Sequence, residues 1–335
     1  MTTLITHIYN EEFLLPFWIK HHVENFESGI VIDFDSSDNS LEIIKELAPH
    51  WKIVKSPLEY FEAESLDRLI ESLESSIEGV RICLNVTEFL IGDPASVINP
   101  IVIPQVSLIN MPNDSKFDLS VPFHMQRNFG LISSEEKRVD EIDFPIFSGA
   151  TGRSIHRQSL RYPLGRHFEL MEPNEMLIYR VSDCFVNEEM FLRRLQIQSK
   201  IPNSEFKKGR GNHHTNSGRG LEMQDLLDLE QIAQKYAINL KGLIDQAFFF
   251  QSFHKRIREG NAVSLSEHKI AWQAVRVNFG IEGIPQFNFN THFGLRATHS
   301  IRKKYEESLS WKISKPLRII GDIVRSIRAL VRLSS

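Results

Sequence analysis

The sequence predicts an α/β fold in which a mostly parallel sheet carries helices on both faces. Two observations on the first ninety residues predict it: apolar, β-branched runs alternate with helical stripes, and polar residues follow each apolar run. A third observation is the composition. The 335 residues are 41% hydrophobic and 24% charged, which excludes a disordered chain and a collagen-like fibre.

Each element of this first part has a local signal. Apolar β-branched runs mark the strands, and apolar residues three or four positions apart mark the helices between them. Asp38 or Ser40 can cap the second helix, and Pro49 ends it. Strands are expected at 3–9, 29–34, 51–55 and 80–86, and helices at 11–26, 40–48 and about 66–77. Strands joined by helices in this way form right-handed crossovers and a parallel sheet.

The rest of the chain changes character twice. Residues 95–185 contain β-like runs at 100–109, 116–123 and 175–181, separated by polar turns, which predicts a mixed extension of the sheet. Helical spacing follows at about 187–199, 221–236, 240–259 and 265–278. We therefore expect one α/β domain over 1–220, a helical region packed on it over 221–300, and a basic amphipathic helix or tail over 301–335.

Charge is distributed unevenly along the chain. Residues 301–335 hold nine Lys and Arg against three acids, a charge of +6, so the total of -4 leaves -10 on the remaining residues. An acidic body argues against a nucleic-acid partner. Residues 317–333 place apolar and Arg side chains on opposite faces of a predicted helix, which suits an anionic membrane surface or docking on the acidic body.

The N-terminal residues lack the basic and apolar segments of a signal peptide. No run of about 18 apolar residues occurs, so no membrane-spanning helix is expected. The two cysteines, Cys83 and Cys184, cannot form a disulfide framework and are expected to be reduced. These features predict a cytoplasmic protein, peripheral on the inner face of the cell membrane if its basic tail binds there.

Polar residues at the strand ends define a candidate site. In a parallel sheet these ends meet at one edge, where ligands bind. The residues concerned are Asn10, Glu11, Asp33, Asp35, Asn85, Thr87 and Glu88.

Three segments in this order resemble the family 2-like glycosyltransferases of the GT-A fold. The resemblance is to the branch with an N-terminal Asn-Glu-Glu segment, and it covers residues 3–93. The segments are Tyr9-Asn10-Glu11, the turn from Asp33 through Asp38, and Asn85-Val86-Thr87-Glu88-Phe89, which stands where the family has D-x-D-E-F. The resemblance implies a GT-A domain over 1–220 that binds a UDP- or GDP-sugar.

In that family the first two strand ends hold the base and ribose, which implies contacts from Tyr9, Asn10, Glu11 and Asp33. The D-x-D segment holds Mn²⁺ or Mg²⁺ against the diphosphate. Here Asn85 and Thr87 replace both aspartates, which leaves Glu88 as the carboxylate.

Three explanations stay open at this point. Glu88 can hold the metal with help from elsewhere, for which His213 is a candidate ligand; basic side chains can neutralise the diphosphate instead; or catalysis has been lost.

Two basic segments could supply that charge. Arg153, His156 and Arg166 lie near glycines, and guanidinium groups bind phosphate through two hydrogen bonds. His213 and His214 belong to a Gly-rich basic loop that could close over the diphosphate. The alternatives are a solvated basic turn and a surface loop without function.

Glu188 and Glu189 are the candidates for the base that deprotonates an acceptor hydroxyl. They open a predicted helix in the part of the chain from which family members take this acid. Acids also favour helix N-termini, and Glu189 could simply pair with Arg193 at i+4.

Together these features predict a glycosyltransferase that transfers a sugar to a glycan or lipid-linked acceptor in cell-surface polysaccharide synthesis. The alternative is a catalytically degenerate protein of the same fold that binds a glycan or a partner. A Rossmann-type methyltransferase is disfavoured because no Gly-rich loop follows the first strand.

Overall fold

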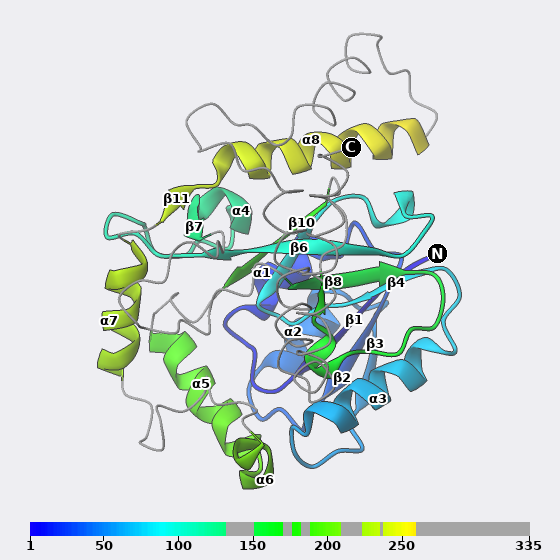
Figure 1. Cartoon of the computed structure of the whole chain (residues 1–335), viewed down its shortest axis with the longest axis horizontal. Coiled ribbons are helices and arrows are strands. Elements are labelled where there is room, and N and C mark those ends of the chain that lie inside the picture. The colour runs from blue at the N-terminus through cyan, green and yellow to red at the C-terminus, as the bar shows by residue number, and fades with distance from the viewer. Residues whose placement is uncertain (132–150, 170–175, 182–187, 209–222, 235–236, 259–335) are drawn as a thin grey trace, which may run out of the picture.

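The computed structural model describes residues 1–131, 151–169, 176–181, 188–208, 223–234 and 237–258. Its first part alternates strands and helices as the sequence predicts (Figure 1). The elements are β1 (Thr2–Ile8), α1 (Leu15–His22), β2 (Ser28–Asp33), α2 (Ser40–Leu47), β3 (Lys52–Lys55), α3 (Ala63–Glu74) and β4 (Val80–Cys83).

The later part contains more strands and a helical region. The strands are β5 (Glu88–Ile91), β6 (Ile101–Leu108), β7 (Phe129–Leu131), β8 (Thr151–His156), β9 (Phe168–Glu169), β10 (Leu177–Val181) and β11 (Ile238–Asn239). The helices are α4 (Phe123–Gln126), α5 (Glu188–Lys200), α6 (Asn203–Lys207), α7 (Met223–Gln234) and α8 (Lys241–Arg258). Short 3-10 turns lie at Pro94–Ser96 and Leu164–Arg166.

The sheet has a parallel core. Strands β4, β1, β2 and β3 are neighbours in that order and all run parallel. Ile5 pairs with Ile30 on one side and with Cys83 on the other, so the three strands share one register. Their carboxyl ends therefore meet at one edge, and the predicted α/β fold with a parallel core is confirmed.

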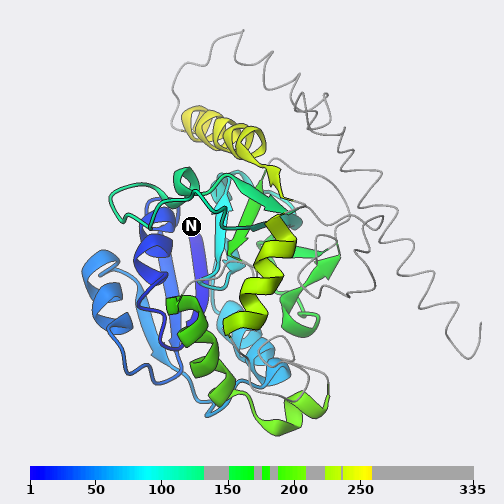
Figure 2. The same cartoon turned by 90° about the vertical axis from the view of Figure 1, so that its left-hand side faces the viewer.

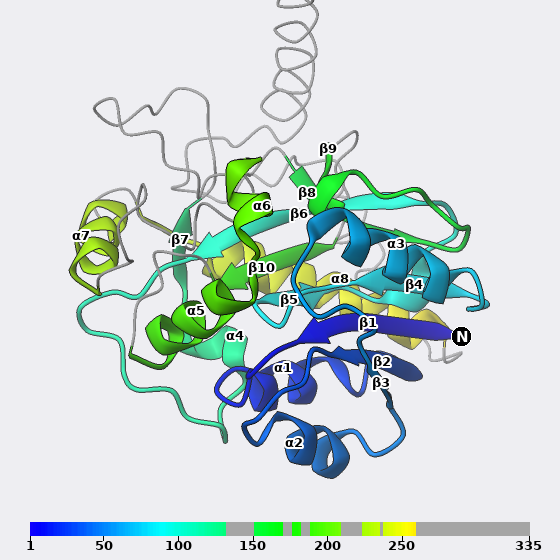
Figure 3. The same ribbon diagram turned by 90° about the horizontal axis from the view of Figure 1, so that it is seen from below.

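Alternating side chains of these strands enter two separate cores. Leu4, Ile8 and Val31 pack in the larger core with α1 and α2, while Ile5 and Ile32 pack in a second core with α3. Figure 3 shows α1 and α2 on one side of β1 to β3 and α3 on the other. Burial on both faces explains why β1 and β2 carry apolar side chains on both faces.

Beyond β4 the sheet becomes mixed, as the sequence predicts for 95–185. Strand β8 runs antiparallel to β4 and β6, and β10 runs parallel to β6 but antiparallel to β5. Helix α8 lies against this extension and contacts β5 (Figures 1 and 2).

One local prediction is wrong, and one alternative is excluded. Residues 116–123 form turns that lead into α4 and not a strand, because Asp118 caps its own turn by accepting from the backbone N–H of Ser120. Residues 151–156 form strand β8, which excludes the alternative of a solvated basic turn there. Its basic side chains are buried because acids from other elements pair with them.

Several predictions concern residues that the structure does not describe. Helix 265–278, the tail over 301–335, Cys184, His213 and His214 lie outside the described residues. Cys83 is buried and its thiol is free. None of the described helices combines the length and the apolar character needed to cross a membrane.

Candidate functional site

The ends of β1 and β2 are joined by hydrogen bonds at the carboxyl edge of the sheet. The side-chain Oδ1 of Asn10 accepts from the backbone N–H of Ser37 at 2.8 Å, and the Asn10 N–H donates to the Ser36 hydroxyl at 3.1 Å. The Asp33 carboxylate accepts from the Ser36 N–H at 3.0 Å. Asn10 has a φ of 53°, a left-handed conformation that Asn tolerates. The structure therefore brings Asn10 and Asp33 together, as the sequence predicts.

The turn between β4 and β5 lies at the same edge and is closed on itself. The Glu88 N–H donates to the Asn85 carbonyl at 2.9 Å, and the Asn85 N–H donates to the Glu88 carboxylate at 2.8 Å. The Thr87 carbonyl accepts from the N–H of Val181 in β10. This turn, residues 85–88, is fixed at both ends, and we call it the Asn85–Glu88 turn.

Glu88 is wholly buried and forms an ion pair with Arg153 of β8. The Arg153 Nε lies 3.0 Å from both carboxylate oxygens, and a terminal nitrogen lies 2.7 Å from Oε1. Gln105 of β6 donates to the same Oε1 at 2.8 Å. Burial raises the pKa of the Glu88 carboxyl, but the Arg153 charge and hydrogen bonds outweigh it and hold that pKa at about 2. Glu88 is therefore an anion neutralised by a guanidinium.

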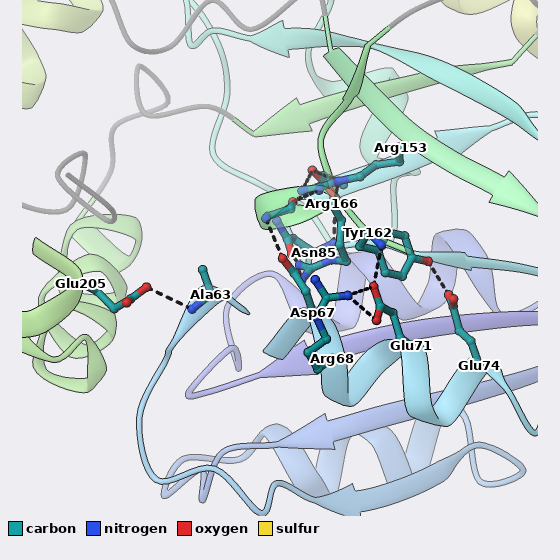
Figure 4. Close-up of polar contacts among 12 residues, drawn as sticks. Ala63, Asp67, Arg68, Glu71, Glu74, Asn85, Arg153, Tyr162, Arg166 and Glu205 are labelled. Atoms are coloured by element: carbon teal, nitrogen blue, oxygen red, sulfur yellow. Dashed lines mark hydrogen bonds and ion pairs between the residues drawn. The ribbon is translucent and has the colours of Figure 1, made fainter. Parts of the chain in front are cut away.

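Arg166 contacts the other end of this turn (Figure 4). One of its terminal nitrogens donates to Asp67 of α3 at 2.7 Å, and the other donates to the Asn85 side chain at 3.3 Å. Asp67 also accepts from the Gly165 N–H. Arg166 is 5% exposed, and its Nε is buried without a hydrogen-bond partner. Its φ of 60° costs about 1–3 kcal/mol for a residue with a Cβ, so the surrounding contacts hold a strained conformation.

Two histidines beside these arginines are uncharged at neutral pH. The positive charge of Arg153 and then burial lower the pKa of His167 to about 3. Burial, followed by the charges of Arg166 and Arg153, lowers the pKa of His7 well below its usual value. The Nδ1 atoms of both rings are buried without a hydrogen-bond partner.

The residues present do not fit the metal that the resemblance implies. Both Glu88 oxygens are occupied by donors, and the Asn85 side-chain oxygen accepts from Arg166. Across the described part of the chain, no group of three or more His, Cys, Asp or Glu side chains is gathered as a metal site. The predicted metal ligand Glu88 is thus already saturated, and the predicted ligand His213 lies outside the described residues.

Helices α5 and α6 are tied to the strand ends. Glu11 follows β1 and forms a two-pronged ion pair with Arg193 of α5. Burial raises the pKa of Glu11 against the lowering effect of Arg193. The Arg193 pairing also corrects the expectation that Arg193 pairs with Glu189. Because both carboxylate oxygens are engaged, Glu11 positions α5 in this arrangement and is not free for a nucleotide.

Two further contacts support the placement of α5 and α6. The Lys200 ammonium lies 4.7 Å from the centre of the Tyr9 ring, a cation–π contact. Glu205 of α6 is buried and accepts from the N–H of Ala63, which begins α3 (Figure 4). Glu188 and Glu189 are exposed in the first turn of α5. The predicted base candidates are therefore carried by a helix that is anchored beside the strand ends.

His156 lies apart from this site. It is wholly buried and hydrogen-bonds to Glu74 of α3 at 3.2 Å, and Tyr162 donates to the same carboxylate at 2.5 Å. Its register partner is Arg81, in the part of β4 away from the turn. This placement corrects the predicted donor contact: the imidazole packs inside the protein.

Five residues of this site are not among those that the sequence predicts for it: Asp67, Gln105, His7, His167 and Arg193. Asp67 and Arg193 lie on helices, where a charged residue suggests a solvated face. His7 occupies the next-to-last position of the apolar run β1, and a polar residue there was the one available signal. The hydrogen-bond partners of Asp67, Gln105 and Arg193 come from distant segments, so no local pattern identifies these three residues.

No family model and no curated protein matches the chain. Among solved structures, S. aureus TarS 1-349 in complex with UDP-GlcNAc is 13% identical, with a TM-score of 0.32, over 78% of this chain and 93% of that one. Its complex with UDP is 12% identical, with a TM-score of 0.32, over 83% and 78%.

A second neighbour is glucosyl-3-phosphoglycerate synthase from Mycobacterium tuberculosis, in complex with Mn²⁺, UDP and glucosyl-3-phosphoglycerate. It is 16% identical with a TM-score of 0.22, over 27% of this chain and 34% of that one. The matched part is thus about a third of the synthase.

Proposed function

We propose that the protein is a glycosyltransferase that takes a sugar from a UDP- or GDP-sugar and transfers it to a glycan or lipid-linked acceptor. The observation that supports it is the convergence at one sheet edge of Asn10, Asp33 and the Asn85–Glu88 turn. These are the three segments that carry the resemblance, and the carboxyl edge of parallel strands is where such sheets bind ligands.

The residues at this edge suit the parts of such a donor. Asp33 ends β2 as a nearly buried carboxylate, whose second oxygen can accept from ribose hydroxyls. Tyr9 offers an aromatic face for the base, although Lys200 also lies over that ring. Glu188 or Glu189, exposed at the start of α5, would take the proton from the acceptor hydroxyl as the new glycosidic bond forms and the nucleoside diphosphate leaves.

Donor binding is tested by calorimetry or thermal shift with UDP, GDP, CMP and the corresponding nucleotide sugars, with and without Mn²⁺. Bound ligand stabilises the native state, so the right nucleotide raises the unfolding temperature. Absence of binding by every nucleotide in both conditions would contradict the proposal.

A pair of matched variants locates the donor. Asp33→Asn keeps the oxygen that accepts from Ser36 but removes the charge, so we expect nucleotide affinity to fall about tenfold, or about 1.4 kcal/mol. Asp245→Asn makes the same change at an exposed carboxylate of α8 that pairs with Lys241. Its affinity should match that of the parent protein. Equal losses in both variants would indicate a general effect of charge instead of a ribose contact.

The base is tested by Glu188→Gln and Glu189→Gln. Loss of a general base lowers the transfer rate by about 10²–10⁴-fold and leaves donor affinity unchanged. If neither variant changes the rate of sugar transfer, the base lies elsewhere.

A degenerate binding protein is the second candidate function. It is favoured by the replacement of both D-x-D aspartates and by the ion pair that saturates Glu88. Nucleotide binding without sugar transfer to any acceptor tested, and without donor hydrolysis, would favour it over the transferase.

Membrane association is a separate proposal that rests on the basic residues of 301–335. Sedimentation with vesicles of phosphatidylglycerol, compared with phosphatidylcholine vesicles, tests it. Basic side chains near an anionic surface contribute about 1 kcal/mol each, and salt should weaken binding. Equal binding to both lipids would contradict it.

A further inference from the structure

We propose that the Asn85–Glu88 turn binds guanidinium groups in place of a divalent cation, so that the protein binds its nucleotide without metal. The second half of this statement rests on the proposed function; the first half does not. In this arrangement Arg166 is the residue that contacts the diphosphate.

The first argument is the state of the Glu88 carboxylate. Arg153, Gln105 and the Asn85 N–H donate to its two oxygens, and Glu88 and Arg153 are 0% and 2% exposed. A divalent cation would need one of these oxygens and would therefore displace the guanidinium. Arg153 would then be left as a buried charge without its partner, which is strongly unfavourable. The ion pair thus excludes the metal from the carboxylate that the sequence retains.

The second argument is that a guanidinium also occupies the other end of the turn. Arg166 donates to the Asn85 side-chain oxygen, the atom that stands where the family has its first aspartate. Asn binds hard cations weakly because it carries no charge. Asn85 and the retained carboxylate of Glu88 are therefore both engaged by arginines from outside the turn.

The third argument is that Arg166 keeps one hydrogen-bond donor that a ligand can use. Arg153 is neutralised by Glu88, and Arg166 is paired with Asp67. Arg166 nevertheless keeps its Nε donor unused, although the side chain is 95% buried and its backbone is held in a left-handed conformation. The unpaired Nδ1 atoms of His7 and His167 are two more polar groups beside these arginines. A diphosphate oxygen would satisfy an Nε–H that is otherwise costly to bury.

The metal is tested first, on the unaltered full chain and without nucleotide. Titration with Mn²⁺ is followed by electron paramagnetic resonance, in which bound ions lose the signal of free Mn²⁺. We expect no saturable binding at the sheet edge. A stoichiometric Mn²⁺ site that is lost in the double variant Glu88→Gln/Arg153→Met would overturn the proposal.

The affinities for UDP and GDP are then measured with Mn²⁺ and with EDTA. We expect them to agree within about twofold, whereas a metal-bridged diphosphate would lose about tenfold or more, that is 1.4 kcal/mol or more, on chelation. Such a loss would overturn the proposal. Failure of every nucleotide to bind in either condition would instead refute the proposed function, while the Mn²⁺ titration still decides the nature of the turn.

Arg166 is tested by Arg166→Lys, which keeps the positive charge but lacks the Nε–H and the planar fork. The matched control is Arg157→Lys, at an exposed arginine that donates to the Val97 carbonyl. We expect UDP or GDP affinity to fall about tenfold only in the first variant. In Arg166→Lys the affinity for UMP, which lacks the second phosphate, should fall less than the affinity for UDP. Equal affinity of Arg166→Lys and the parent protein, with both folded, would show that Arg166 does not contact the diphosphate.

Discussion

Arg193 of α5 holds the carboxylate of Glu11 with two of its guanidinium nitrogens, across 182 positions of sequence. The pair lies at the end of β1, with Glu11 4% exposed and Arg193 14% exposed. It fixes the helix that carries the base candidates beside the edge where Asn10 and Asp33 meet. This ion pair is therefore one of the contacts that link the two parts of the proposed site.

Removal of Arg193, the partner of Glu11, should destabilise the folded protein. Arg193→Met leaves the Glu11 carboxylate buried without its cation, and we expect a loss of about 3–5 kcal/mol in the free energy of unfolding. The double variant Glu11→Gln/Arg193→Met removes both charges and should recover most of that loss. Urea denaturation of the parent and both variants measures it. A single variant as stable as the parent would show that the pair does not anchor α5.

The Glu88–Arg153 pair predicts a specific response to acid. Because the pKa of Glu88 in the folded protein, about 2, is below its ordinary value of 4.5, its contribution is fully present above pH 4.5. This contribution to the free energy of unfolding, about 3 kcal/mol, is lost as the pH falls from 4.5 towards 2.

The double variant Glu88→Gln/Arg153→Met should therefore show a flatter stability profile between pH 4.5 and pH 2. Denaturation at a series of pH values measures the difference. Parallel profiles for variant and parent would contradict the role assigned to this pair.

His167 should remain neutral through the physiological range. Arg153 first, and then burial, hold its pKa at about 3, so its imidazole resonances in an NMR titration should not move between about pH 5 and 8. In Arg153→Met the largest cause is gone, and the pKa of His167 should rise toward its usual value. An unchanged pKa in that variant would mean that burial alone accounts for the shift.

The cluster of Glu74, His156 and Tyr162 should affect stability and not nucleotide binding. Glu74→Ala leaves two buried groups, the Tyr162 hydroxyl and the His156 ring, without their acceptor, at about 1–3 kcal/mol each. Glu78→Ala, at an exposed glutamate just beyond the same helix, should change stability by less than about 0.5 kcal/mol. Thermal unfolding and UDP or GDP titration distinguish the two effects. A loss of affinity in folded Glu74→Ala would place this cluster in the site.

The parallel core could be predicted because its signal is local. The four runs ending near residues 9, 34, 55 and 86 are rich in apolar, β-branched residues, and the structure has strands at all four. Strand β8 could not be predicted in this way. Arg153 and His156 make it polar in sequence, and their burial depends on Glu88 and Glu74 from other elements.

The sequence by itself determined the order of strands and helices in the parallel core, and it identified Asn10, Asp33 and the Asn85–Glu88 turn as one edge of a sheet. Only the tertiary structure decided which charges pair: Glu88 with Arg153, Asp67 with Arg166 and Glu11 with Arg193, over separations of 65, 99 and 182 residues.

The physical reason is that strand and helix patterns follow from neighbouring residues, whereas an ion pair depends on which surfaces the fold brings together. The entropy of closing a loop grows only with the logarithm of its length, so distance along the chain hardly restricts the choice of partner. Burial then fixes the choice, because each charge taken from water has to meet its opposite.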